Sequence, residues 1–279
     1  MKIGFLQFAP VLGDLRATMH RIDSLLQENM EGCDLLVLPE LCNSGYNFQS
    51  YEQAWETSEP IEDSIFVRYL INKCRERNLH VVSGFNERDR DTLYNSAILV
   101  GPHGLIGTYR KLHLFLNEKD FFRPGNQGVP VFDIGSCIIG MLICFDWTFP
   151  EAWRIAALKG ADIICHPSNL VLPGLAQRGV PIHALLNRLY IVTANRIGAE
   201  RDLSFTGSSI IANPRGDLLC QASPIKAEVG IAEIDIGLAR DKQITDRNDL
   251  FKDRRPEEYS LLTEPNPFGR GSGRTGHGK

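Results

Sequence analysis

The sequence GMLICFDWTFPEAWRIAAL, residues 140–158, joins an apolar strand to a segment typical of the start of a helix, and Cys144 stands at the junction. A cysteine at such a sharp junction has its sulfur lifted above the edge of the sheet. Nearby helix amides and the helix dipole would favour its thiolate over its thiol. Free cysteine is also among the most buried residue types, so Cys144 taken alone could be an ordinary core side chain. The junction is nevertheless a place where a nucleophile is expected.

Two other apolar strands end in the same way. The strand CDLLVLPE ends at Glu40, directly after Pro39, and the strand GLIGTYRK ends at Lys111. In open sheets with helices packed on their faces, ligands and chemistry collect in the crevice beyond the strand ends. A carboxylate, an ammonium and a thiol placed there form a candidate catalytic set.

Apolar strands alternate along the chain with segments that carry apolar residues at helical spacing. This alternation predicts an α/β fold with helices packed on a mixed sheet. We expect one domain over residues 1–261 and a Gly- and Pro-rich, disordered tail at 262–279. Strands are predicted at 2–8, 33–40, 79–87, 93–100, 104–111, 129–134, 136–144, 161–168 and 190–195, with two more inside 208–223; helices are predicted at 14–30, 63–78, after Cys144 and at 183–189.

Composition and charge exclude several classes of protein. The formal net charge of −4 gives no footprint for binding nucleic acid. No run of about 18 apolar residues predicts a membrane helix, and MKIGFLQFAP lacks the features of a signal peptide, so we expect a cytoplasmic protein. The seven cysteines are widely spaced without a C-x-x-C pair, and H-E-x-x-H does not occur. We therefore expect reduced thiols, no metal and no cofactor.

The three strand ends carry the motifs PEL around Glu40, YRKLHLF around Lys111 and CFDWTFPEAWR around Cys144. In their order and spacing they resemble the nitrilase superfamily of carbon-nitrogen hydrolases, over residues 2–260. The CFDW motif and residues 166–198 are most similar to the compact archaeal-type nitrilases. The resemblance implies a four-layer α-β-β-α sandwich that dimerises through one helical layer.

The resemblance also implies roles for the site residues. Cys144 would be the nucleophile, Glu40 the general base, and Lys111 the cation near the developing oxyanion, which the N–H of Phe145 would also hold. A thiol with an ordinary pKa is mostly protonated at neutral pH, so an adjacent carboxylate that accepts its proton supplies what the sulfur lacks. Without the resemblance, Lys111 could be a solvated lysine paired with Glu40.

Further residues are implied to bind substrate. Glu118 resembles a second glutamate that braces the lysine or orients the substrate, although by itself it would be a surface carboxylate. Tyr46 resembles a pocket tyrosine, although a lone aromatic is more often core. Trp147 and Asn169 are placed near the pocket by adjacency alone. His113 and Asp146 flank catalytic positions and are expected to be structural.

The implied activity is hydrolysis of a non-peptide carbon–nitrogen bond in a small aliphatic amide or nitrile, through a thioester or thioimidate, with release of ammonia and a carboxylic acid. The same three residues serve both substrates. Many nitrilases in the strict sense have Cys-Trp-Glu at the nucleophile, whereas this chain has Cys144-Phe145-Asp146, which favours an amide. An N-carbamoyl amine amidohydrolase is the alternative.

Two other classes of protein fit the sequence less well. A serine hydrolase of the amidase-signature kind would need a longer Gly/Ser block than FTGSS around Ser208 and Ser209, and G-x-S-x-G is absent. A catalytically inactive interaction module would be expected to have lost Glu40, Lys111 or Cys144, and all three are present.

The segment DKQITDRNDLFKDRRPEEY, residues 241–259, carries charges of both signs and few apolar side chains, too few to pack on its own core. It resembles the C-terminal arm that crosses the dimer interface of archaeal-type relatives, with Phe251 and Tyr259 as aromatic anchors. The alternative is a solvated tail. We expect a homodimer or a higher homo-oligomer that binds a small-molecule amide or nitrile, with no nucleic acid or membrane partner.

Overall fold

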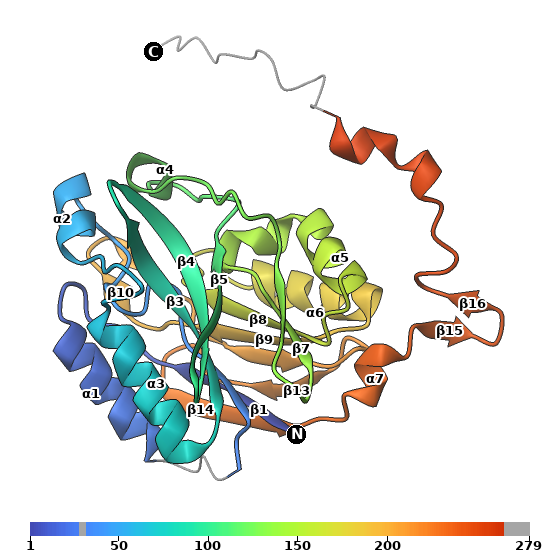
Figure 1. Ribbon diagram of the computed structural model, residues 1–279, viewed down its shortest axis with the longest axis horizontal. Helices are drawn as coiled ribbons and strands as arrows, with labels where there is room; N and C mark the ends of the chain where they lie inside the picture. Colours follow the sequence, from blue (N-terminus) through green and yellow to red (C-terminus); the bar gives the residue numbers. More distant parts are fainter. Residues whose placement is uncertain (28–31, 265–279) are drawn as a thin grey trace. The chain divides into compact units, whose positions relative to one another are not determined.

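Two sheets of six strands each form the centre of residues 1–242 (Figure 1). The computed structural model describes residues 1–27 and 32–264. The first sheet consists, in spatial order, of β14 (Glu228–Glu233), β1 (Lys2–Gln7), β2 (Leu35–Val37), β3 (His80–Asp89), β4 (Thr92–Gly101) and β5 (Gly104–Arg110). The second consists of β13 (Leu218–Gln221), β12 (Ile210–Ala212), β9 (Tyr190–Asn195), β8 (Ile163–Ser168), β7 (Ile138–Met141) and β6 (Val131–Asp133).

The two sheets have the same plan. In the first, β1, β2 and β3 run parallel, and β14, β4 and β5 join by antiparallel pairing. In the second, β7, β8 and β9 run parallel, and β6, β12 and β13 join by antiparallel pairing. The central strands are almost wholly buried, as expected for parallel strands covered on both faces. The predicted mixed pairing is confirmed, in two sheets.

Helices cover the outer face of each sheet, and the inner faces meet. Helices α1 (Leu15–Leu26) and α3 (Ile65–Arg77) pack against the first sheet, whereas α5 (Pro150–Leu158) and α6 (Leu175–Asn187) lie over the second (Figure 1). Strands β1 and β2 of the first sheet contact β9 and β8 of the second. The order of layers is α-β-β-α, which confirms the expected four-layer sandwich.

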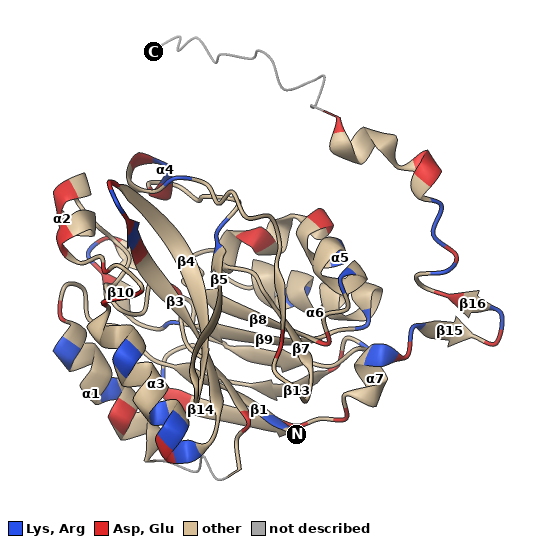
Figure 2. Cartoon of the chain, in the orientation of Figure 1, with Lys and Arg blue, Asp and Glu red and all other residues tan. Residues whose placement is uncertain are grey.

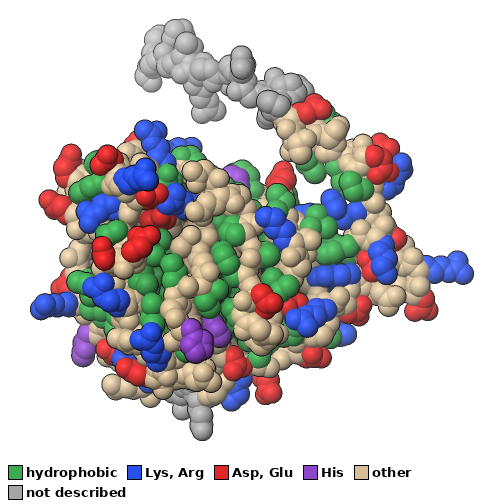
Figure 3. All heavy atoms as spheres, in the orientation of Figure 1, with side chains coloured by type: hydrophobic (Ala, Val, Ile, Leu, Met, Phe, Trp, Pro, Cys, Tyr) green, Lys and Arg blue, Asp and Glu red, His purple; other side chains and the backbone are tan. Residues whose placement is uncertain are grey.

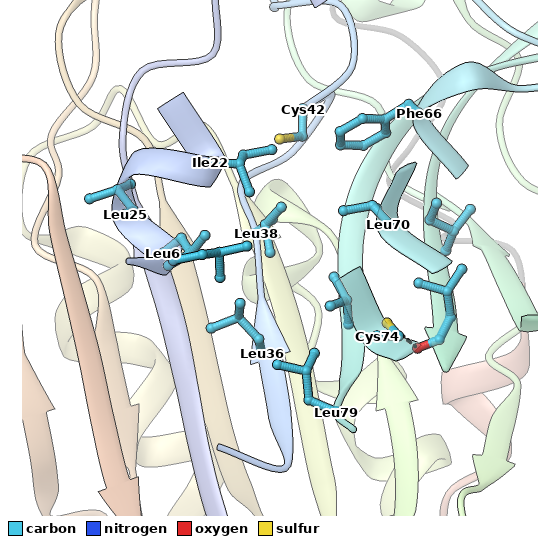
Figure 4. Close-up of a cluster of buried hydrophobic side chains, with 14 of the residues drawn as sticks. Leu6, Ile22, Leu25, Leu36, Leu38, Cys42, Phe66, Leu70, Cys74 and Leu79 are labelled. Carbon is cyan, nitrogen blue, oxygen red and sulfur yellow. Dashed lines mark hydrogen bonds between the residues drawn. The ribbon is translucent and has the colours of Figure 1, made fainter. Parts of the chain in front are cut away.

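The core under α1 and α3 shows why these segments form helices there (Figure 4). Ile22 and Leu25 of α1, and Phe66 and Leu70 of α3, turn one apolar face onto the strands. Each such side chain contributes about 1.5 to 3 kcal/mol when it is fully buried. The thiols of Cys42 and Cys74 lie in this core, and burial raises the pKa of each to about 12.

Charged side chains of both signs lie on the outer helices α1 and α3 and on the short helix α4 (Glu118–Phe121). The short helix α2 (Tyr51–Glu56) carries acidic ones, and β7, β8 and β9 carry none (Figure 2). The space-filling view shows Lys and Arg interspersed with Asp and Glu over this face (Figure 3). Within residues 1–27 and 32–264, no helix combines the length and apolar character needed to span a membrane.

Helix α6 begins at Leu175, eight residues earlier than the predicted start at residue 183. Gly179 and Pro181 lie inside it, and both are unfavourable in helix interiors. Packing explains the glycine: a Cβ there would meet the Trp147 ring at 2.8 Å. The 183–189 prediction was therefore too short at its start because tertiary contact overrides local propensity.

Short elements outside the two sheets were not predicted. They are α2, α4, α7 (Gly237–Arg240) and the two-stranded ribbon of β10 (Ala199–Glu200) and β11 (Leu203–Ser204).

Residues from Gln243 onward belong to a second unit, separate from residues 1–242. Its described part contains the ribbon of β15 (Gln243–Thr245) and β16 (Asn248–Asp249) and the 3-10 helices η2 (Pro256–Glu258) and η3 (Ser260–Thr263). The predicted boundary at residue 261 and the predicted disordered tail at 262–279 remain predictions. Leu262 to Glu264 are described, and residues 265–279 lie outside the described residues.

Candidate active site

Cys144 begins a turn in which the backbone reverses after β7. Its φ of 42° is in the left-handed region, which is uncommon for a residue other than glycine. The five residues Cys144–Thr148 form a 3-10 helix, which we call the nucleophile turn, and α5 starts only at Pro150. Strain of this kind at a buried cysteine is a reason to look for function.

The predicted stabilisation of the Cys144 thiolate is wrong for the resting site. Burial, and then the charge of Glu40, raise the pKa of the Cys144 thiol well above its ordinary value; Lys111 and the N–H of Asn169 act in the opposite direction. The α-helix that was expected to follow Cys144 directly is separated from it by the nucleophile turn. The thiol is therefore protonated at neutral pH and needs a base.

Asp146 fixes the shape of the nucleophile turn. Its Oδ2 accepts hydrogen bonds from the Tyr109 hydroxyl at 2.7 Å and from the Ile143 N–H at 2.9 Å. Its Oδ1 lies 2.7 Å from Nδ1 of His113, whose ring stacks on Phe149. Asp146 and His113 thus have the structural roles expected of them.

Glu40 follows β2 and lies entirely inside the protein. Its Oε1 accepts hydrogen bonds from Asn95 Nδ2 and Lys111 Nζ, both at 2.7 Å, while Oε2 is buried with no partner among the described residues. Gly84 of β3 makes this position possible, because a Cβ there would stand 2.3 Å from the Glu40 Cα. One carboxylate oxygen is therefore anchored and the other is available.

Lys111 directly follows β5 and is fully buried between two glutamates. Its Nζ lies 2.7 Å from Glu40 Oε1 and 2.8 Å from Glu118 Oε1. Burial alone would lower the pKa of Lys111, but the charges of Glu118 and Glu40 outweigh burial and raise it. The lysine is a permanent buried cation and not the solvated strand-end residue of the alternative reading.

Glu118 begins α4 and is buried, unlike a surface loop carboxylate. Its Oε1 accepts from the Tyr46 hydroxyl at 2.7 Å and its Oε2 from the Phe115 N–H at 3.2 Å. Burial and the neighbouring Glu40 raise the pKa of Glu118 to about 7, although Lys111 and Tyr46 counteract them. We call Glu40, Asn95, Lys111, Glu118 and Tyr46 the carboxylate–lysine cluster.

Cys144 opens onto a cavity that is mainly apolar. Of the predicted pocket residues, Phe145, Trp147 and Asn169 line it with Cys144. Asn169 also donates from Nδ2 to the Glu40 carbonyl at 3.0 Å. Tyr46 and Glu118 line a neighbouring cavity instead. The remaining walls of the Cys144 cavity are Phe115, Leu170, Val171 and Leu172.

Several residues of the site were not identified from the sequence. Asn95 lies in the buried strand β4, where a polar side chain among apolar ones was the available signal. Glu200 holds the loop of Tyr46: it accepts from the Tyr46 and Asn47 N–H groups and pairs with Arg196 at 2.7 Å. Glu200 is far from Tyr46 in the sequence, so nothing in the local sequence links the two.

The sequence is similar to those of known proteins over nearly its whole length. The sequence profile of the carbon-nitrogen hydrolase family matches residues 2–243. A nitrilase from Pyrococcus abyssi is 47% identical over 260 residues, 93% of this chain and 99% of the relative. An (R)-stereoselective amidase from Pseudomonas sp. is 34% identical, with 97% of each chain covered.

A solved structure with a similar fold carries an adduct on its own active-site cysteine. A variant of the amidase from Nesterenkonia sp. AN1, in which the acetamide moiety of fluoroacetamide is covalently added at the active-site cysteine, matches with a TM-score of 0.77 at 25% identity, covering 94% of this chain and 96% of that one. The buried cysteine, the strand-end glutamate and lysine, and these relatives lead to one conclusion: the chain belongs to the carbon-nitrogen hydrolase family, the nitrilase superfamily, and is an enzyme that hydrolyses carbon–nitrogen bonds with a cysteine.

Proposed function

We propose that the enzyme hydrolyses small, uncharged aliphatic amides or nitriles, with Cys144 as nucleophile, Glu40 as general base and Lys111 as the cation at the oxyanion. The observation that carries this proposal is the arrangement of Glu40. Its Oε1 is held by Lys111 and Asn95, and its Oε2 is buried without a partner among the described residues. A general base must have an oxygen free to accept a proton.

The first half of the reaction forms the thioester. Glu40 takes the proton of the Cys144 thiol as the sulfur attacks the amide carbon, and the carbonyl π electrons move onto oxygen. Lys111 and the Phe145 N–H hold the resulting oxyanion. Glu40 then gives the proton to the nitrogen, the carbon–nitrogen bond breaks, and ammonia leaves.

The second half releases the acid. Glu40 takes a proton from water, the hydroxide attacks the thioester carbon, and the carbon–sulfur bond breaks as the thiol regains its proton from Glu40. A nitrile follows the same course through a thioimidate and needs a second water.

The walls of the cavity favour an uncharged substrate. Phe115, Phe145, Trp147, Leu170, Val171 and Leu172 line it, and Asn169 is the single polar lining residue besides Cys144 among the described residues. None of the described residues that line this cavity is a carboxylate, so burying the ammonium of an N-carbamoyl diamine among them would be costly. The apolar lining therefore argues for an uncharged amide or nitrile over a charged N-carbamoyl diamine.

The test is an ammonia assay on matched substrates. Purified enzyme is incubated with butyramide, butyronitrile, short dinitriles, 4-aminobutyramide, N-carbamoylpropylamine and N-carbamoyl-1,3-diaminopropane. We expect the highest kcat/KM for the uncharged amides or nitriles. A preference for the carbamoyl diamine would replace this proposal with the alternative, and no ammonia from any compound would overturn it.

We further propose a homodimer. Apolar side chains that an isolated chain exposes lie together on α5 and α6, and burying such a face in a second copy would remove it from water. They are Ile155, Leu158, Ile182, Leu185 and Leu186, each 42 to 53% exposed. Residues 241–259 stay the predicted arm to the partner subunit; Tyr259 is 39% exposed and Phe251 is half-buried.

Sedimentation of the full chain and of a truncation before Asp246 tests the assembly. We expect dimers of the full chain and monomers or unstable dimers of the truncated chain. Unchanged dimers with unchanged thermal stability would show that the arm does not bridge subunits. The cytoplasm is the proposed location, supported by seven free thiols, which persist in reducing compartments.

A further inference from the structure

Three side chains hold three carbonyl groups of the nucleophile turn. His166 Nε2 lies 2.9 Å from the Cys144 carbonyl oxygen, Trp153 Nε1 donates to that of Asp146 at 3.2 Å, and His183 Nε2 lies 2.9 Å from that of Trp147. A carbonyl oxygen can only accept, so both histidines carry a proton on Nε2. The turn that bears the nucleophile is thus clamped from the side of α5, α6 and β8.

The donors also fix one another. The Trp153 ring stacks on His183 with centroids 4.8 Å apart and planes at 2°, and it meets the edge of His166 at 5.5 Å. Thr193 Oγ1 lies 3.0 Å from His166 Nδ1, which fits a hydroxyl donating to the unprotonated nitrogen of that ring. Burial lowers the pKa of His166 to about 4 and also lowers that of His183, so both rings are neutral at neutral pH.

The hydrogen bond of His166 to the Cys144 carbonyl also affects the direction of the Phe145 N–H. The Cys144 C=O and the Phe145 N–H belong to one planar peptide unit, and no cis peptide bond occurs among the described residues. In a trans unit the two groups point in opposite directions. A donor that fixes the C=O therefore also fixes the direction of the N–H.

We infer that His166 is a positioning residue that, by holding the Cys144 carbonyl, aims the Phe145 N–H at the oxyanion. This inference rests on the proposed function, in which that N–H is an oxyanion donor. The N–H is available for it because the first N–H groups of a helical turn have no acceptor within the turn. Cys144 has a left-handed φ, which is uncommon for a residue other than glycine, so a side-chain donor on its carbonyl helps to hold an unusual backbone direction.

Two amide substitutions separate positioning from packing. In His166→Gln the amide nitrogen occupies the place of Nε2 and can still reach the Cys144 carbonyl. In His166→Asn it occupies the place of Nδ1 and faces Thr193 instead. His166→Met fills the volume without any donor, and His80→Leu, at the remote start of β3, is the control for loss of a partly buried histidine.

We expect His166→Met and His166→Asn to lower kcat roughly 10- to 100-fold with KM within about threefold, because loss of one oxyanion donor costs about 10²- to 10³-fold and a misdirected donor is only partly lost. His166→Gln should recover most of kcat, and His80→Leu should keep it. Rates of acylation in a single turnover should follow the same order.

The kcat values of these variants decide whether His166 positions the Phe145 N–H. Equal kcat in the Gln and Asn variants, or a change in Tm alone with kcat retained, would overturn the role of His166. Should His166→Met fail to fold, the comparison of Gln with Asn decides by the same readout. Failure of the proposed function is distinguishable, because the wild-type enzyme would then release no ammonia and form no Cys144 adduct.

Discussion

The first sheet and the second sheet position their catalytic residues by different interactions. Glu40 and Lys111 follow strands of the first sheet, and their positions are set by side-chain charge: carboxylates and an ammonium meet at 2.7 and 2.8 Å in a fully buried cluster. Cys144 follows a strand of the second sheet, and its position is set by the backbone, through the carbonyls held by His166, Trp153 and His183.

This difference separates two tasks of the catalytic site. The carboxylate–lysine cluster governs proton transfer: burial and then the charge of Glu40 raise the pKa of the Cys144 thiol, and one oxygen of Glu40 stays free to accept its proton. The nucleophile turn determines where groups point. Variants in the two regions should therefore fail in different ways.

The largest effect is expected from loss of the Cys144 sulfur, on which both the carboxylate–lysine cluster and the nucleophile turn act. Cys144→Ala removes the nucleophile and should lower kcat by roughly 10⁴-fold or more with the fold intact. Ammonia release and thermal melting measure the two parts of this prediction. Mass spectrometry of the wild type with a poor substrate should find an acyl adduct on the Cys144 peptide, and an adduct on another cysteine would end the assignment.

A second, smaller effect should distinguish the two glutamates of the carboxylate–lysine cluster, Glu40 and Glu118. Glu40→Gln should block acylation and lower kcat by roughly 10²- to 10⁴-fold, because general base catalysis is worth that much. Glu118→Gln, its matched control, still accepts from Lys111 and should slow turnover less while acylation persists. Single-turnover kinetics with mass detection of the adduct distinguish them, and normal acylation in Glu40→Gln would remove it as the base.

The third prediction concerns stability in the nucleophile turn. Asp146→Asn replaces a buried acceptor of several hydrogen bonds and should lower the free energy of unfolding by about 2 to 4 kcal/mol. Urea denaturation measures it. Asp133→Asn, an exposed acceptor from the Gly135 N–H, should stay within about 0.5 kcal/mol. Equal stability of the two variants would show that Asp146 does not hold the turn.

The smallest expected effect is a dependence on pH. Burial and Glu40 raise the pKa of Glu118 from 4.5 to about 7, so the folded chain binds this proton more tightly than the unfolded chain. The free energy of unfolding should therefore fall, by about 1 to 3 kcal/mol from this group, as pH rises from 4.5 to 7. Relative to wild type, Glu118→Gln should become more stable across this range, and parallel curves of stability against pH would contradict the raised pKa.

The sequence by itself determined the elements that repeat a simple pattern. Apolar strands such as β1, β8 and β9, and the amphipathic helices α1 and α3, follow from the spacing of their apolar residues. Glu40, Lys111 and Cys144 could be singled out because each stands at the end of such a strand. Their shared position is visible in the sequence because carboxyl ends of neighbouring strands meet at one edge of a sheet.

Tertiary structure decided what depends on burial and on contacts far apart in the chain. The length of α6 depends on Gly179 fitting against Trp147, and the pKa of Cys144 depends on desolvation that cannot be read from its neighbours in sequence. Asn95 joins Glu40 across 55 residues, and His166 reaches Cys144 across 22. Local sequence sets the preference for strand or helix, but free energies of burial and the directions of hydrogen bonds arise only when distant segments pack together.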